Sequence, residues 1–308
     1  MMIKKILILV IAVFSVSLII EFSLRMYGLG NPIVYEKSLY WGYSPKPNQI
    51  TSRFKNSKIT INEFGVRSKK IEKKFFDFLF FGDSVTYGGS YIDDDETFSS
   101  IVCNNLNRSR NKKDLTCGNA GVNAYGIKNI IPRINYLKDK YPNNKIIITV
   151  ITGNFLRNFS QIESLPYFTK RNDHLFKASV ELIAFSLDLV RKSIRYKSNN
   201  FFLGENAIYN KYEFIDAADT LQSYYYNNIN NNNILIIWSP SLNNFENGLS
   251  ELDKELIDKL DIFKDDFVNM YNEINSRNIH YKKIFYDQIH LNKYGHQIYG
   301  KIIADKFK

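Results

Sequence analysis

The sequence predicts an α/β fold in which a mainly parallel sheet lies between two layers of helices. Short apolar segments rich in aromatic and β-branched residues recur along the chain, as at residues 76–81 and 234–239, and are typical of buried strands. Amphipathic helical segments separate them. Strands that alternate with helices favour a parallel sheet covered on both faces. The 308 residues suffice for one sizeable core.

The first thirty residues predict a membrane anchor. Lys4 and Lys5 precede an uncharged run of fifteen residues, Ile6 to Ile20, and a helix that continued to residue 27 would be long enough to span a bilayer. The basic pair favours a cytoplasmic amino terminus, with the rest of the chain outside the cytoplasm. The next segment, "EFSLRMYGLG", lacks a convincing small-residue cleavage site. A cleaved signal peptide, which would give a secreted or periplasmic protein, is the alternative to an anchor over residues 1–27.

The rest of the chain divides into a lead-in and a domain. Residues 28–73 are rich in turn-forming residues, and we expect an extended stalk with at most one hairpin. Residues 74–308 form the main domain. Its predicted strands are 76–81, 115–118, 145–153 and 234–239, and its predicted helices are 96–107, 127–141, 213–229, 252–274 and 295–307.

A helical insertion interrupts this alternation at about residues 155–210. Its segment "FKASVELIAFSLDLVRKSIRYK" has charged residues on one stripe at helical spacing and is otherwise largely apolar. We expect an amphipathic helix that packs on the core. The alternative is a lid, or a membrane-facing element near the site.

Charge and cysteine content narrow the possible partners. The net charge is +10, but the lysines are scattered among acidic residues and form no basic stripe, so we expect no nucleic-acid partner. The two cysteines, Cys103 and Cys117, are too few for a zinc site of the usual spacing. They either pair in an oxidising compartment or remain as buried thiols.

A candidate nucleophile lies in "FFGDSVTYGG", where an apolar strand ends at Gly82, Asp83 and Ser84. A serine needs a base to accept its proton, and the base needs a partner that orients it. Of the four histidines, only His290, in "DQIHLNKYGH", combines a nearby upstream acid, Asp287, with a loop and a following helix start. In Asp-x-x-His the carboxylate can reach Nδ1 while Nε2 faces outward. We expect Asp83 to order the turn behind Ser84.

Two further segments could stabilise an oxyanion. "NAGVNAYG" (119–126) is a turn of small residues that follows a strand, and "TGN" (152–154) ends another strand with the amide of Asn154. The carboxyl ends of parallel strands meet at one edge of a sheet, where sites are built. The sequence therefore predicts that these segments lie near Ser84.

These four segments, in their order along the chain, resemble the blocks of the SGNH or GDSL-type hydrolase family. With "INEFGVR" (61–67) and the segment after the anchor, they are most similar to a membrane-anchored bacterial branch associated with surface polysaccharides. The resemblance implies a flavodoxin-like three-layer sandwich with Ser84 as nucleophile and with His290 and Asp287 completing a triad. It also implies an oxyanion hole made by the N–H groups of Ser84 and Ala124 and the amide of Asn154.

Two departures from the family pattern concern the oxyanion hole. Ala124 stands where the family has glycine, and its N–H can serve if φ is negative, whereas a positive φ would strain the residue. Phe155 follows Asn154 where the family usually has an acid. Asn158 is the alternative amide if the segment is remodelled.

The resemblance implies a serine esterase that hydrolyses O-acyl esters, above all O-acetyl esters, on a cell-surface or secreted glycan. It implies no metal and no cofactor, and it leaves the oligomeric state open. Two other functions fit the same residues. One is an O-acyltransferase with the same triad. The other is a non-catalytic glycan-binding or assembly protein, which a Ser84–His290 separation beyond hydrogen-bond reach would favour.

Overall fold

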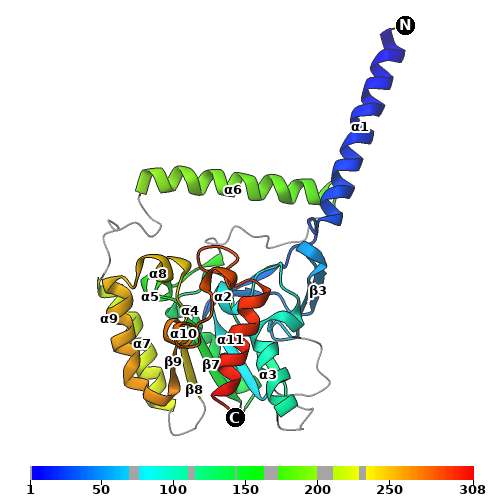
Figure 1. The fold of residues 1–308 in the computed structure, drawn as a ribbon. Helices are drawn as coiled ribbons and strands as arrows, with labels where there is room; N and C mark the ends of the chain where they lie inside the picture. The colour runs from blue at the N-terminus through cyan, green and yellow to red at the C-terminus, as the bar shows by residue number, and fades with distance from the viewer. Residues whose placement is uncertain are drawn as a thin grey trace.

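The structure is a computed structural model that describes residues 2–68, 76–109, 115–142, 144–162, 173–199, 211–228 and 234–308. The expected domain boundary near residue 73 lies outside these ranges, as do residues 163–172 and 200–210 of the helical insertion. Figure 1 shows an α/β domain from which one helix, α1, projects, while a second helix, α6, lies crosswise to it.

The centre of the domain is a five-stranded sheet in the order β6-β5-β7-β8-β9. All four neighbouring pairs are parallel. Every residue of the central strands β5 and β8 is buried, as expected for a sheet covered on both faces. The predicted α/β class with a mainly parallel sheet is thus confirmed. The strands are β5 (Phe78–Gly82), β6 (Cys117–Asn119), β7 (Lys145–Val150), β8 (Ile234–Trp238) and β9 (Phe267–Asn269).

Alternate side chains of each strand enter two separate cores. Leu79 and Phe81 of β5 join one core with α4, α7 and α9, whereas Phe78 and Phe80 join the other with α3, α10 and α11. The sheet is therefore the middle layer of three. The helices are α3 (Phe98–Ser109), α4 (Ile127–Lys140), α7 (Lys211–Asn228), α9 (Glu251–Leu260), α10 (Met270–Ser276) and α11 (Lys293–Asp305), with the short α2 (Ser84–Tyr87), α5 (Gly153–Leu156) and α8 (Leu242–Asn247) at strand ends.

The prediction of one helix over residues 252–274 is wrong. Helix α9 ends at Leu260, a 3-10 segment follows over Asp261–Asp266, and β9 then pairs with β8 before α10 begins. Lys264 interrupts the helical backbone with φ 51°. A strand of three residues is too short to show alternation, so only its pairing at the sheet edge makes it a strand.

The expected stalk over residues 28–73 also differs from the structure. Two antiparallel hairpins form there, and their side chains Tyr43 and Ile59 are fully buried in the core shared with α4. Turn-forming residues therefore mark hairpin ends rather than a free linker. The strands are β1 (Tyr35–Ser38), β2 (Gly42–Pro45), β3 (Gln49–Ser52) and β4 (Lys58–Ile61).

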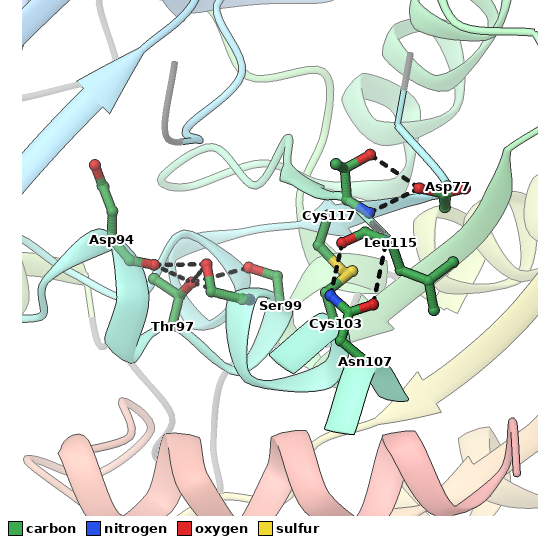
Figure 2. The surroundings of a disulfide bond; sticks show 10 residues. Asp77, Asp94, Thr97, Ser99, Cys103, Asn107, Leu115 and Cys117 are labelled. Carbon is green, nitrogen blue, oxygen red and sulfur yellow. Dashed lines mark hydrogen bonds between the residues drawn. A yellow bond between two sulfur atoms is a disulfide. The ribbon is translucent and has the colours of Figure 1, made fainter. Parts of the chain in front are cut away.

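Of the two alternatives for the cysteines, the structure shows pairing. Cys103 on α3 is bonded to Cys117 on β6 (Figure 2). Beside the bridge, the Asn107 amide accepts from Leu115 N–H at 3.0 Å and donates to its carbonyl at 3.1 Å. The bridge ties a helix to the edge strand across 14 residues. A disulfide that closes a loop of this length stabilises the folded protein by about 3 kcal/mol.

Two helices lie largely outside the domain. Helix α1 (Met2–Met26) has a mean hydropathy of 2.7, is almost wholly exposed, and is long and apolar enough to cross a membrane, a property that signal sequences share. Helix α6 (Lys177–Asn199) exposes several apolar side chains, including Ile183 and Leu187. Ala178 and Glu181 in the first turns are buried, but most of the described apolar side chains that follow are exposed, so the expectation that this helix packs on the core holds only at its start.

Candidate active site

Ser84 is the first residue of α2, at the carboxyl end of β5. Asp83 caps this helix by accepting the N–H of Val85 at 3.0 Å, as expected from the sequence. Gly82 is required for the sharp turn, because a Cβ there would lie 2.2 Å from Thr86 Oγ1 and 2.4 Å from the carbonyl oxygen of Thr149. The turn leaves Ser84 partly exposed among buried neighbours.

His290 reaches Ser84 from a loop that is 206 residues away in the sequence. Its Nε2 lies 2.8 Å from Ser84 Oγ, and its Nδ1 lies 2.7 Å from Asp287 Oδ2. Burial of Asp287 disfavours the charged form, but hydrogen bonds from the His290 ring and from the backbone N–H groups of His290 and Ile289 outweigh it, and they lower the pKa of Asp287 to about 2. The carboxylate is thus anionic at neutral pH and can hold a proton on Nδ1.

A small hairpin holds the acid and the histidine in this geometry. Tyr286 N–H donates to the carbonyl of His290 at 2.7 Å, and Asn292 N–H donates to that of Ile284 at 3.0 Å. Tyr91, from the loop after α2, stacks on Tyr286 and donates its hydroxyl to the carbonyl of Leu291 at 3.0 Å. The loop beside the nucleophile therefore braces the loop that carries the base.

Arg67 fixes the chain that follows Ser84. The guanidinium is buried, pairs with Asp94 at 2.9 Å, and donates to the carbonyls of Tyr87, Gly89 and Ile92. Arg67 ends the "INEFGVR" segment. A buried arginine is costly without a paired acid, and Asp94 supplies that acid. Sequence reasoning used the segment only for the family resemblance and missed this role of Arg67.

Ser84 N–H and Ala124 N–H are the two backbone donors that the family resemblance implies for the oxyanion hole. Neither Ser84 N–H nor Ala124 N–H has a hydrogen-bond acceptor among the described residues. The turn with Ala124 is tied to the nucleophile turn, because Val122 N–H donates to the carbonyl of Gly82 at 3.1 Å. Ala124 has φ 62°, so the less favourable of the two expectations for this residue holds and its backbone is strained.

Asn154 differs from its expected role. The side chain is fully buried, its amide donates to Asp83 Oδ2 at 3.0 Å and to the carbonyl of Tyr125 at 2.8 Å, and its oxygen accepts from Ile151 N–H. An amide has two N–H hydrogens, and both are engaged. In this conformation Asn154 joins the nucleophile turn to the second turn and presents no donor to an oxyanion.

Arg157, which the sequence reasoning missed, strengthens the same junction. Its guanidinium donates to Asp83 Oδ2 at 2.9 Å and to the carbonyl of Tyr125 at 3.0 Å. Asn158, the alternative oxyanion donor, instead faces the carboxylate of Glu213 at 2.8 Å. Within the described ranges, no group of three or more His, Cys, Asp and Glu side chains is placed to hold a metal ion.

No protein-family model matches the chain, and no curated protein matches it. Several solved structures are similar at low identity. A G-D-S-L lipolytic protein from Veillonella parvula is 12% identical over 75% of this chain and 97% of its own, with a TM-score of 0.39. A putative G-D-S-L lipolytic protein from Desulfitobacterium hafniense is 11% identical over 74% and 98%, with a TM-score of 0.42. A variant acetyl xylan esterase from Geobacillus stearothermophilus is 13% identical over 76% and 96%, with a TM-score of 0.44.

Proposed function

We propose that the chain is a serine esterase of the SGNH type, with Ser84, His290 and Asp287 as its triad. The observation that carries the proposal is the unbroken hydrogen-bond chain from Ser84 Oγ through His290 to Asp287, at 2.8 and 2.7 Å. Structural ion pairs of histidine are common, but a serine on a sharp strand-to-helix turn at the histidine's second nitrogen is the arrangement that activates a nucleophile.

In this mechanism Ser84 Oγ attacks the carbonyl carbon of an ester while His290 Nε2 takes its proton. The tetrahedral intermediate carries its negative charge on the former carbonyl oxygen, which the N–H groups of Ser84 and Ala124 stabilise. The intermediate collapses to an acyl-serine, and His290 returns the proton to the departing alcohol. Water then attacks the acyl-serine with His290 again as base, and the acid is released.

The substrate class is proposed from the family resemblance: O-acyl groups, and acetyl in particular, on a cell-surface or secreted glycan. A Ser84–His290 separation beyond hydrogen-bond reach would have favoured a non-catalytic protein, but the two side chains are within hydrogen-bond distance. This distance does not separate hydrolysis from acyl transfer, in which a sugar hydroxyl replaces water in the second step.

We further propose that α1 is an uncleaved, single-pass anchor with its amino terminus in the cytoplasm and the domain outside. Support comes from Glu21 near the end of α1. Its carboxylate is buried and accepts the N–H groups of Ala178 and Ser179 at 3.0 and 2.9 Å, so the helix end is part of the fold. In the native membrane fraction, the mature protein should keep its first residues and resist extraction by high salt.

Acetate release from O-acetylated glycans and from 4-nitrophenyl acetate tests the esterase. Full-length protein in lipid nanodiscs should release acetate from at least one of them, and Ser84→Ala should not. An added unacetylated glycan distinguishes transfer from hydrolysis, because transfer would leave acetyl groups on it. Folded protein that releases and transfers no acetyl group from any member of the panel would contradict the proposal.

A further inference from the structure

Helix α6 begins where α1 ends and lies crosswise to it (Figure 1). Figure 1 also shows α6 on the side of the domain where α2 and α8 lie, which is the side of the strand carboxyl ends. The helix thus lies between the side toward which α1 extends and the edge of the sheet that carries Ser84, Asp287 and His290, which we call the catalytic edge. Few of its described side chains enter the core, so contacts other than core packing must hold α6 in this position.

A buried carboxylate joins the two helices. Glu21 on α1 accepts hydrogen bonds from the N–H groups of Ala178 and Ser179 and from Ser179 Oγ, at 2.8 to 3.0 Å. These are first-turn groups of α6 that have no partner within the helix, and a negative charge there is favourable. Arg25 completes the joint by pairing with Glu21 at 2.7 Å and donating to the carbonyl of Leu175 at 2.5 Å.

A second buried carboxylate fixes the rotation of α6 about its own axis. Glu181 pairs with Arg53 of the domain at 2.5 Å and accepts from Gly30 N–H at 2.5 Å. Arg53 also donates to the carbonyl of Gly28 at 3.0 Å. The side of α6 that carries Glu181 therefore faces the domain.

The opposite side of α6 carries an apolar stripe of four residues, Val180, Ile183, Leu187 and Val190. They recur at intervals of three and four residues, as one face of a helix requires. Their exposed fractions are 40, 58, 51 and 54%. At the start of the stripe, the ring of Phe176 meets that of Phe14 on α1, at 6.4 Å between centroids. The stripe thus lies on the side toward which α1 extends.

The height of α6 along α1 matches the edge of a bilayer. The uncharged run Ile6–Ile20 spans about 22 Å at about 1.5 Å per residue, less than the roughly 30 Å of a typical hydrocarbon core. The next residue, Glu21, holds α6. A bilayer that covers the run therefore ends at α6 or beyond it.

We propose that α6 is an interfacial helix whose apolar stripe (Val180, Ile183, Leu187 and Val190) is buried in the outer leaflet of the bilayer that α1 spans. The helix and α1 together hold the domain in one orientation, with its catalytic edge toward the lipid surface. This inference rests on the proposed anchor but not on the esterase activity. The proposal is that lipid, and not a second protein, covers the stripe.

Site-directed spin labelling of the full-length protein in nanodiscs tests the occupant. Cys103 and Cys117 are paired, so an added cysteine is the one free thiol. Labels at Ile183, Leu187 and Val190 should collide more with lipid-soluble oxygen than with a water-soluble nickel chelate. Ile11→Cys, in the middle of α1, is the lipid-exposed control. Tyr226→Cys, an exposed position on α7, is the water-exposed control.

The outcomes separate the possible explanations. Nickel accessibility of the stripe equal to that of Tyr226→Cys would place it in water and overturn the proposal. Protection from both reagents would place it against protein and also overturn it. If Ile11→Cys itself is accessible to nickel, the anchor fails and this inference falls with it. In an Ile183→Glu, Leu187→Glu variant, the label at Val190 should become accessible to nickel while the label at Ile11 does not.

Discussion

The catalytic edge and the joint between α6 and the domain use charge in opposite ways. At the catalytic edge, the side chains of Asp287 and His290 are 47 and 27% exposed and lie three residues apart. At the joint, the side chains of Arg53 and Glu181 are 5 and 7% exposed and lie 128 residues apart. The first arrangement leaves a base open to substrate, whereas the second removes charges from water to fix two segments in space.

The difference predicts where a mutation acts. Changes at Asp287 or His290 should lower the rate with little loss of stability, because these two groups remain solvated without their partners. Changes at the joint should lower stability and leave chemistry on a small soluble ester intact, because a buried charge that loses its partner is costly.

Loss of the nucleophile should give the largest effect. Ser84→Ala and His290→Ala should each lower kcat on a small acetyl ester by about 10⁶-fold, the scale seen when either member of a serine–histidine pair is removed. The double variant should be hardly worse than either single one, since the two act as a unit. Ser186→Ala, an exposed serine on α6, is the matched control. Losses that add in the double variant would contradict a shared mechanism.

Glu181→Ala should weaken the joint by about 3–5 kcal/mol, because it leaves Arg53 buried without its carboxylate. Hydrogen exchange of residues 28–34 and of the start of α6 measures this local opening, and kcat on a soluble ester should not change. Glu251→Ala removes an exposed partner of Lys254 and should leave exchange unchanged. Equal effects of the two variants would mean that burial of the pair is unimportant.

Asn154→Ala distinguishes a positioning residue from an oxyanion donor. If the amide joins Asp83 to Tyr125, its removal leaves buried groups unsatisfied and should lower the free energy of unfolding by about 1–3 kcal/mol. A pure oxyanion donor would instead lower kcat by about 10²–10³-fold with stability unchanged. Thermal unfolding and kcat measured on the same preparation separate the two roles.

His296, behind the catalytic edge, should produce the smallest effect. Burial is the main reason that its pKa falls to about 3 in the folded chain, against about 6.5 when unfolded. Between these values the unfolded state binds a proton that the folded state does not, so stability falls as pH falls. The expected loss is about 1.4 kcal/mol per pH unit below 6.5. His296→Gln should remove this slope between pH 6.5 and 5, and His280→Gln, at an exposed position, should not.

Patterns within a few residues were enough to predict much of the fold. Four of the five strands of the central sheet were expected from apolar segments, and Asp83 was expected to order the turn behind Ser84. The fifth strand, β9, was missed because its pairing with β8, rather than its own three residues, makes it a strand. The hairpins of residues 35–61 were mistaken for a stalk because their burial depends on the distant helix α4.

By itself, the sequence determined the candidate residues of the catalytic edge and the apolar character of α1. Asp-x-x-His and a serine after an apolar strand are local patterns, and Asp287 meets His290 through a three-residue separation. Only the tertiary structure decided that Asn154 is engaged by Asp83 and Tyr125, that Ala124 has a positive φ, and that Glu21 and Glu181 hold α6 away from the core. Each of these depends on partners or backbone geometry that exist only after distant segments pack. No local pattern in the sequence could therefore predict them.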